Sequence, residues 1–189
     1  GGCLGLRIFE RIGMETEYIS INKFLSEAGV CSRRGADRLV EEGRVTIDGK
    51  VAVLGDQILP GQKVLVDGRE IQREDEKILL AFHKPKGIVC TAEKREKNNI
   101  IDYIHYPKRI YPVGRLDKDS EGLILLTNDG ELGNEILRAR NFHEKEYIVT
   151  VNRPVTDEFL RGMAGGVPIL DTITRKSKVE KLDKRKIRI

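Results

Sequence analysis

Residues 20–72 constrain the fold more than any other part of the chain. Apolar side chains recur there at helical spacing in two short stretches, and a glycine follows each of them, at Gly29 and Gly43. Glycine just past the last periodic residue is a common helix stop, and Ser32 stands where the second helix needs an N-cap. The spacing therefore predicts one helix over Ile21–Ala28 and another between Ser32 and Gly43.

Short strands and tight turns follow these helices. Val45–Ile47 and Val51–Val53 flank an Asp48-Gly49 pair, which is a strong hairpin signal. A Pro60-Gly61 turn and the apolar run Val64–Val66 predict a further strand. Together these features predict a two-helix, small-sheet module of about 50 residues, near the lower size limit for independent folding.

The rest of the chain is organised around this module. Residues 1–19 lack periodicity and contain a candidate start at Met14, so we expect an N-terminal extension there. Residues 73–77 are polar and predict a linker. Residues 78–189 predict a second domain of alternating short elements. Strands are expected at Ile78–Phe82, Ile88–Cys90, Leu123–Leu126, Tyr147–Val151, and near Val179 and Ile187, with helices near Asn98–Ile104, up to Leu137, and from Thr156 to Met163.

Composition excludes several classes of protein. No apolar run is long enough to span a membrane. The cysteines (Cys3, Cys31 and Cys90) are odd in number and widely spaced, and the three histidines show no ligand-like spacing. We therefore expect no metal site, no disulfide framework and reduced thiols in a cytoplasmic protein.

Positive charge is concentrated at the end of the sequence. Residues 175–189 carry eight Lys or Arg against two Asp or Glu, a net charge of +6, whereas the other 174 residues carry a net charge of −2. A basic segment on a nearly neutral body is typical of a protein with a polyanionic partner. A pair of solvated strands would give the same pattern, and both interpretations remain open.

The module at residues 20–72 resembles the S4 family of RNA-binding domains. The motifs that carry the resemblance are Ile21-Asn22-Lys23-Phe24-Leu25, Ser32-Arg33-Arg34 and Val45-Thr46-Ile47-Asp48-Gly49-Lys50, together with Gly29, Ala36 and Gly43. The resemblance implies that the second helix and its neighbours bind structured RNA. The residues expected to contact RNA are Lys23, Ser32, Arg33, Arg34, Arg38, Arg44 and Lys50.

Residues 114–130 contain the most chemically suggestive motif. A polar cluster around Asp117 leads directly into the apolar run Leu123–Leu126. Asp117, Asp119 and Glu121 match the start of a twelve-residue calcium loop, but the twelfth position is Asn128, where a glutamate is needed. Asp117 and Asp119 could also form a glycosidase-like carboxylate pair, although in an extended segment they would point to opposite sides. A salt-bridged turn is a third interpretation.

Three motifs resemble those of the RsuA/RluA superfamily of pseudouridine synthases. They are Lys84-Pro85-Lys86-Gly87, the stretch from Gly114 to Leu123, and Lys145-Glu146-Tyr147. With an S4-like module in front, the architecture resembles the RsuA-like branch. The stretches Asn141–Tyr147 and Gly162–Leu170 are most similar to members that act on large-subunit ribosomal RNA. The resemblance implies an α+β fold, in which the S4 module precedes a synthase domain with a mixed, mainly antiparallel sheet.

The same resemblance assigns roles to particular residues. Asp117 would be the essential carboxylate, which either attacks the ribose C1′ or stabilises positive charge on the sugar. Tyr147 would stack on the flipped uracil or transfer a proton, although a place in the strand core is the alternative for it. Arg115 would fill the space that the base leaves or hold a phosphate, and Lys84 and Lys86 would contact the RNA backbone. Arg115 would also supply a cation near Asp117 that favours its ionised form.

We accordingly expect an RNA pseudouridine synthase without a cofactor, a monomer whose substrate is ribosomal RNA, with transfer RNA as a second candidate. The family has a further basic motif beyond the position equivalent to Ile189. We therefore expect a truncated domain with an open sheet edge at Ile189, weak stability and no activity. The alternative function is a non-catalytic RNA-binding protein of the S4 type.

Overall fold

The computed structural model describes residues 18–73, 76–138 and 141–189, so most of the predicted extension, including Met14, lies outside the described residues. The described chain forms two compact units, one ending at Asn141 and the other running from Phe142 to Ile189. Within the first unit we call residues 19–71 the N-terminal module and residues 76–141 the central module. Residues 142–189 are the C-terminal unit.

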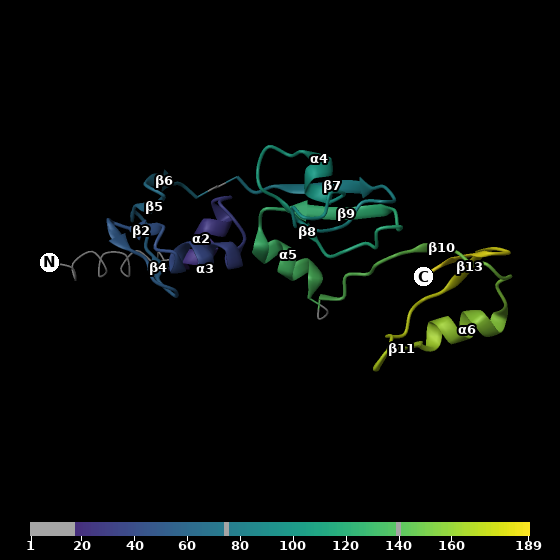
Figure 1. Cartoon of the computed structure of the whole chain (residues 1–189). Coiled ribbons are helices and arrows are strands. Elements are labelled where there is room, and N and C mark those ends of the chain that lie inside the picture. Colours follow the sequence, from purple (N-terminus) through teal and green to yellow (C-terminus); the bar gives the residue numbers. More distant parts are fainter. Residues whose placement is uncertain (1–17, 74–75, 139–140) are drawn as a thin grey trace. The chain divides into compact units, whose positions relative to one another are not determined.

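Most of the elements are labelled in Figure 1. In chain order they are β1 (Ile19–Ser20), α2 (Ile21–Glu27), α3 (Arg33–Glu41), β2 (Val45–Ile47), β3 (Lys50–Val51), β4 (Gln57–Ile58), β5 (Val64–Val66), β6 (Arg69–Ile71), β7 (Leu79–Lys84), α4 (Ile100–Ile104), β8 (Tyr111–Val113), β9 (Gly122–Thr127), α5 (Gly130–Leu137), β10 (Ile148–Thr150), α6 (Asp157–Gly165), β11 (Pro168–Ile169), β12 (Thr172–Ile173), β13 (Glu180–Asp183) and β14 (Lys186–Arg188).

Both helices of the N-terminal module end as their glycines predict. Gly29 and Gly43 have φ values of +80° and +69°. After α2 the amides of Gly29 and Val30 donate to the carbonyls of Ser26 and Leu25, and the amides of Gly43 and Arg44 make the same pair of bonds after α3. This is the Schellman arrangement, which satisfies carbonyls at the end of a helix. At the other end of α3, Ser32 is the predicted N-cap, and its hydroxyl accepts a hydrogen bond from the Gly35 amide.

The four-stranded sheet of this module is built from tight hairpins, in the order β3-β2-β5-β6. Asp48 and Gly49 both have positive φ and join β2 to β3, as a type I′ turn requires. The second strand of this hairpin was predicted at Val51–Val53, but β3 comprises Lys50–Val51. Ala52 follows the strand, and its side chain is buried in the core. Strand β6 was not predicted from the sequence, because its first two residues, Arg69 and Glu70, are charged and exposed, as residues of a linker usually are.

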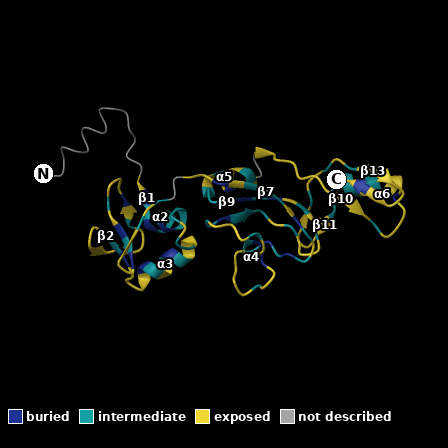
Figure 2. Ribbon diagram, turned by 90° about the horizontal axis from the view of Figure 1, so that it is seen from above, coloured by how far each residue is buried: buried dark blue, intermediate teal, exposed yellow. Residues whose placement is uncertain are grey.

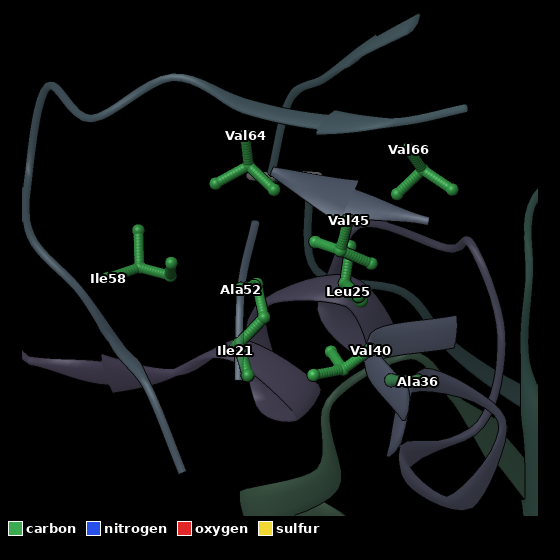
Figure 3. Close-up of a cluster of buried hydrophobic side chains, with 9 residues drawn as sticks. All are labelled: Ile21, Leu25, Ala36, Val40, Val45, Ala52, Ile58, Val64 and Val66. Carbon is green, nitrogen blue, oxygen red and sulfur yellow. The ribbon is translucent and has the colours of Figure 1, made fainter. Parts of the chain in front are cut away.

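The two helices pack on this sheet through one apolar cluster, shown in Figure 3. Each of its residues is buried, and Leu25, Ala36 and Val45 have no exposed surface. Full burial of each large aliphatic side chain stabilises a fold by about 1.5–3 kcal/mol. The cluster consists of Ile21, Leu25, Ala36, Val40, Val45, Ala52, Ile58, Val64 and Val66.

The central module contains an antiparallel sheet in the order β7-β9-β8. Strand β9 is paired on both sides, and α5 packs against β8 and β9. Asp129 is the N-cap of α5, and its side chain accepts from the amides of Glu131 and Leu132. The predicted strand at Leu123–Leu126 and the predicted helix ending at Leu137 are therefore confirmed.

The prediction of a strand at Ile88–Cys90 is wrong. Ile88 and Cys90 are buried, but the only ladder contact of this segment in the described chain is a single bridge between Val89 and Asn99. Its backbone is satisfied in other ways, since the Ile88 carbonyl accepts from the Lys84 side chain and the Val89 amide donates to Asn98. Apolar runs of this length do not distinguish a strand from a buried irregular segment.

The C-terminal unit has an antiparallel sheet in the order β10-β14-β13, accompanied by α6 and a small β11–β12 hairpin. Thr156 caps α6 as predicted, accepting a hydrogen bond from the Phe159 amide. The prediction of an open edge at Ile189 is wrong, because β14 is the central strand and β10 and β13 are the edges. The chain order of the strands did not reveal which of them lies in the middle.

The fold class predicted from the sequence, α+β, is confirmed. Every ladder between named strands is antiparallel, and the bridge between Val89 and Asn99 is parallel. Across residues 18–73, 76–138 and 141–189, no helix has the length and apolar character needed to cross a bilayer.

Candidate active site

Asp117 lies on the loop that joins β8 to β9. Its side chain and those of Arg115, Lys118 and Asp119 are exposed. The loop closes as a turn, because the Ser120 amide donates to the Asp117 carbonyl at 3.0 Å. Within the described chain no ion pair joins any of these four side chains to another residue. The salt-bridged turn is therefore wrong, and Arg115 does not supply the predicted cation in contact with Asp117.

The backbone of this loop is nonetheless fixed on both sides of Asp117. The Leu116 amide donates to the Cys90 Sγ at 3.4 Å, and the Leu116 side chain packs against the apolar core of the central module. The Lys118 carbonyl accepts from the Gly87 amide at 2.7 Å and from the Lys84 Nζ at 3.2 Å. A free carboxylate on an anchored backbone is suited to meet a substrate without first breaking an ion pair.

Lys84 does not have the role that the sequence predicted for it. Its side chain is completely buried, and its ammonium group donates to the carbonyls of Pro85, Ile88 and Lys118. An ammonium group has three protons, and all three are used. The prediction that Lys84 contacts the RNA backbone is therefore wrong, whereas Lys86 in the same turn is exposed and forms no ion pair in the described chain.

The other chemical interpretations of this loop can now be judged. A twelve-residue calcium loop starting at Asp117 cannot form, because Gly122–Thr127 is a regular strand paired on both sides. The sequence analysis argued against a carboxylate pair because Asp117 and Asp119 would point to opposite sides of an extended segment. The two residues lie in a turn instead, so that argument was wrong. Among the described residues, no group of three His, Cys, Asp or Glu side chains is arranged to hold a metal ion.

Tyr147 immediately precedes β10 in the C-terminal unit. Its backbone is held in register by two hydrogen bonds with Ile189, of 2.8 and 3.0 Å. Its side chain is 43% exposed, so the alternative of a core tyrosine is wrong. The exposed ring is available for stacking on a base.

The candidate RNA-binding residues of the N-terminal module fall into two groups. Arg33, Arg34 and Arg38 on α3, with Lys50 after the β2–β3 turn, are exposed and form no ion pair in the described part of the chain. The Ser32 hydroxyl accepts from the Gly35 amide and still has a proton to donate. These five residues remain predicted RNA contacts.

Lys23 and Arg44 form the second group, because acidic partners already occupy them. Lys23 forms ion pairs with Glu27 and Glu131. Arg44 makes two hydrogen bonds to Asp67 and one to Glu42. The hydrogen bonds from Arg44 lower the pKa of the Asp67 carboxyl below its ordinary value, and the hydrogen bond from Lys23 does the same for the pKa of Glu131. RNA would have to displace these carboxylates to reach either cation.

Sequence reasoning missed the residues that position Asp117. Cys90 was considered as a reduced thiol and as the end of a predicted strand, and Gly87 only as part of a family motif, yet both bond to the loop. Gly87 has a φ of +87°, a conformation that favours glycine, so this residue was the available signal for a turn after β7. Nothing in the sequence indicated that its amide bonds to Lys118.

These features define a class of protein: an α+β chain in which a small helix-and-sheet module with exposed arginines on one helix is followed by a domain that presents an exposed carboxylate on an anchored loop. The family model of RNA pseudouridylate synthases matches residues 78–188, and that of the S4 domain matches residues 20–64. The chain belongs to the RNA pseudouridylate synthase family, and the resemblance predicted from its motifs is confirmed.

Several curated proteins are similar to the chain. The dual-specificity RNA pseudouridine synthase RluF of Salmonella typhi is 59% identical over 163 residues, which cover 85% of this chain and 56% of that protein. RluF of Escherichia coli K12 is 56% identical, covering 86% of this chain and 57% of that protein. The ribosomal large subunit pseudouridine synthase B of Bacillus subtilis is 35% identical, covering 88% and 70%. The chain thus spans a little over half the length of the two RluF proteins.

A solved structure is similar as well. A crystal structure described as a pseudouridylate synthase matches with a TM-score of 0.59 and 27% sequence identity, over 90% of this chain and 75% of that one. The fold seen here is therefore one that this family uses.

Proposed function

We propose that this chain forms part of an enzyme that converts a uridine of RNA into pseudouridine. The observation that carries the proposal is the Asp117 carboxylate, exposed and unpaired in the described chain on a loop whose backbone is anchored on both sides. The family to which the chain belongs supports the choice of reaction.

The reaction needs only what such a site can supply. The glycosidic bond between C1′ and N1 of uridine breaks, the uracil turns, and a bond forms between C1′ and C5. The proton on C5 is lost and N1 gains one, so atoms and charge balance without an oxidant, a reductant or a second substrate. Asp117 either attacks C1′ or stabilises the positive charge that develops on the sugar. Tyr147 stacks on the flipped uracil, and Arg115 takes the space that the base vacates or holds a phosphate.

We also propose a domain division and a substrate. The S4 domain spans residues 20–72, a linker spans 73–77, and the synthase domain begins at residue 78. The substrate is large-subunit ribosomal RNA, with transfer RNA as a second candidate, since the similar proteins are named as ribosomal large subunit or dual-specificity enzymes. We further propose that the chain acts as a monomer in the cytoplasm.

Asp117→Asn tests the proposal. RNA carrying tritium at C5 of uridine releases label when pseudouridine forms, and RNA binding is measured in parallel. The expectation of an inactive chain rested partly on an open edge at Ile189, which the sheet does not have. We therefore expect the unaltered chain to release label and Asp117→Asn to abolish the release without changing RNA affinity, because the amide is isosteric but cannot act as a carboxylate. Asp119→Asn removes the same charge two residues away and serves as the matched control.

The second candidate function is RNA binding without catalysis, which the unpaired cations on α3 favour. If the unaltered chain binds RNA but releases no label under any condition, the catalytic proposal fails for this chain and the binding function replaces it. If RNA binding does not weaken as salt rises, both functions fail, since phosphate contacts release counterions.

A further inference from the structure

The β11–β12 hairpin of the C-terminal unit has an apolar tip. Ile169, Leu170 and Ile173 are 49%, 98% and 68% exposed, although they lie within five residues of one another. Apolar residues scattered singly over a surface are ordinary, whereas apolar residues gathered at one exposed place mark a contact surface. The tip of this hairpin is therefore a candidate binding element.

The residue at the very tip also has a backbone conformation that leucine rarely adopts. Ile169 pairs with Thr172, so Leu170 and Asp171 form a two-residue turn. Leu170 has a φ of +50°, and such positions in short hairpin turns usually hold glycine, asparagine or aspartate. Neither backbone preference nor burial favours a leucine there. An unfavourable conformation of this kind points to a role in binding.

The base of the hairpin is anchored, so the tip is held in a defined place. The Val167 amide donates to the Thr174 hydroxyl at 2.8 Å, and the Thr174 amide donates to the Val167 carbonyl at 2.9 Å. The Ser177 amide donates to the carbonyl of Ala164 near the end of α6. A Cβ on Gly166 would lie 2.7 Å from the Thr174 carbonyl oxygen, so only glycine permits this close approach. In Figure 1 the hairpin extends past the C-terminal end of α6.

Apolar side chains lie on both faces of the hairpin. Pro168 pairs with Ile173, and Ile169 pairs with Thr172. Because neighbouring pairs alternate between the two faces of a ladder, Ile169 and Ile173 point to opposite sides. A flat protein surface would cover only one of these sides. An element that is apolar on both sides fits between two stacked layers, and proteins that bend nucleic acids insert such apolar wedges between base steps.

The charges next to the tip also fit a nucleic acid. Arg175, Lys176 and Lys178 follow the hairpin, and in the described chain they are exposed and form no ion pair. Asp171 is the only acidic residue between Gly166 and Lys178. Phosphate contacts position a protein on a nucleic acid, so these cations can hold a backbone beside the apolar tip. They supplement the unpaired cations of α3.

We propose that the β11–β12 hairpin is an RNA wedge, which inserts Leu170 between stacked bases next to the target uridine. Unstacking a neighbouring base lowers the cost of turning the uridine out of the helix, as an enzyme acting on a base requires. This inference deepens the proposed function and rests on it for the identity of the target base. The insertion itself can be measured without any conversion of uridine.

The probe is a short RNA duplex with one bulged uridine beside 2-aminopurine, whose fluorescence rises when the base unstacks. At saturating concentration the unaltered chain should raise this fluorescence. Leu170→Ala should remove most of the rise and weaken binding about tenfold, because the buried surface of the leucine is lost. Leu182→Ala makes the same change on β13 of the same unit and should keep the full rise.

Two further variants at the tip guard against misfolding. Glycine favours a positive φ, so Leu170→Gly should be at least as stable in urea as the unaltered chain, yet it should lose the rise as well. Asp171→Asn should keep the rise and strengthen binding about twofold, because it removes a negative charge that faces the phosphates.

Four results would overturn the proposal. The unaltered chain binds no RNA, which would also contradict the proposed function, or it binds the duplex without a rise. Alternatively, both Leu170 variants keep the rise, or they lose only a self-association seen in sedimentation, which would make the tip a contact between copies of the chain. Unstacking without release of tritium label would contradict only the catalytic function. Label release that persists unchanged in Leu170→Gly would contradict only the wedge.

Discussion

The N-terminal module and the C-terminal unit are of similar length, yet they pack very differently. The module closes its two helices and its sheet around one cluster of nine buried apolar residues. In the C-terminal unit only Val155 and Ile187 are buried, and α6 has no buried residue. Figure 2 shows the contrast, with dark blue along α2, α3 and β2 and mostly yellow and teal in the C-terminal unit.

This difference lies in where the apolar side chains fall, not in how many hydrogen bonds are made. The C-terminal unit has regular ladders and a well-formed cap on α6. Its large apolar side chains are exposed, however, with Leu170 at 98% and Ile173 at 68%. Backbone hydrogen bonds exchange water for protein partners at little net gain, whereas apolar burial provides most of the stability. The module should therefore be the stable part and the C-terminal unit the part that opens first.

The largest expected difference between the N-terminal module and the C-terminal unit is in the rate of amide hydrogen exchange. Amides in β2 and β5, next to the buried cluster, should be protected about a thousandfold more than amides in β13 and β14. Both pairs of strands are antiparallel, so the ladders themselves are comparable. Equal protection in the two regions would show that burial does not set local stability here.

Two Leu→Ala substitutions test the same contrast by stability. Leu25→Ala removes a side chain with no exposed surface and should lower the free energy of unfolding by about 2–5 kcal/mol. Leu170→Ala makes the same chemical change at a 98% exposed position and should change it by less than about 0.5 kcal/mol. Urea denaturation measures both. A large loss from the Leu170 variant would mean that its side chain is covered in solution.

A third test asks which region recognises RNA. Arg33→Ala with Arg34→Ala removes two unpaired cations from α3, on the rigid module. Arg175→Ala with Lys176→Ala removes two exposed cations from the C-terminal unit. If the α3 pair contacts phosphates, the slope of log affinity against log salt should fall by about two, and the second pair should change it less. The opposite order would place the main RNA contact in the C-terminal unit.

The contrast also explains what could be predicted from the sequence. The glycines at 29 and 43 and the Asp48-Gly49 turn impose backbone conformations that few other residues adopt, so the helix ends and the hairpin of the module followed from the sequence. Strand order in the C-terminal unit depends on contacts between distant segments. The central position of β14 was therefore not foreseen.

Only part of the candidate site could be predicted from the sequence. The motif identified Asp117, because a family resemblance can be read residue by residue. Lys84 was misassigned because nothing in Lys84-Pro85-Lys86-Gly87 distinguishes the buried lysine from the exposed one. Alternation along β7 could have helped: Leu80, Phe82 and Lys84 share one face of the strand, and Leu80 and Phe82 pack against the apolar core.

The smallest effect separates free cations from occupied ones within the N-terminal module. Asp67→Asn removes the carboxylate that holds Arg44. If Arg44 contacts RNA, its guanidinium, then held only by Glu42, should raise RNA affinity by about twofold. Glu70→Gln is the matched control, because it removes one negative charge from the same module and frees Lys63, which is not a predicted contact. An equal gain from both variants would show only a general effect of charge.

The same variant predicts a pH dependence with a defined sign. Arg44 lowers the pKa of Asp67 in the folded chain, so their interaction stabilises the fold above the ordinary aspartate pKa and is lost as pH falls through the lowered value. Between neutral pH and strongly acidic pH, the unaltered chain should therefore lose slightly more stability than Asp67→Asn. Because both groups are at the surface, the difference should shrink as salt is added. A difference that persists at high salt would mean that the Arg44–Asp67 pair is shielded from solvent in a way that its exposure does not suggest.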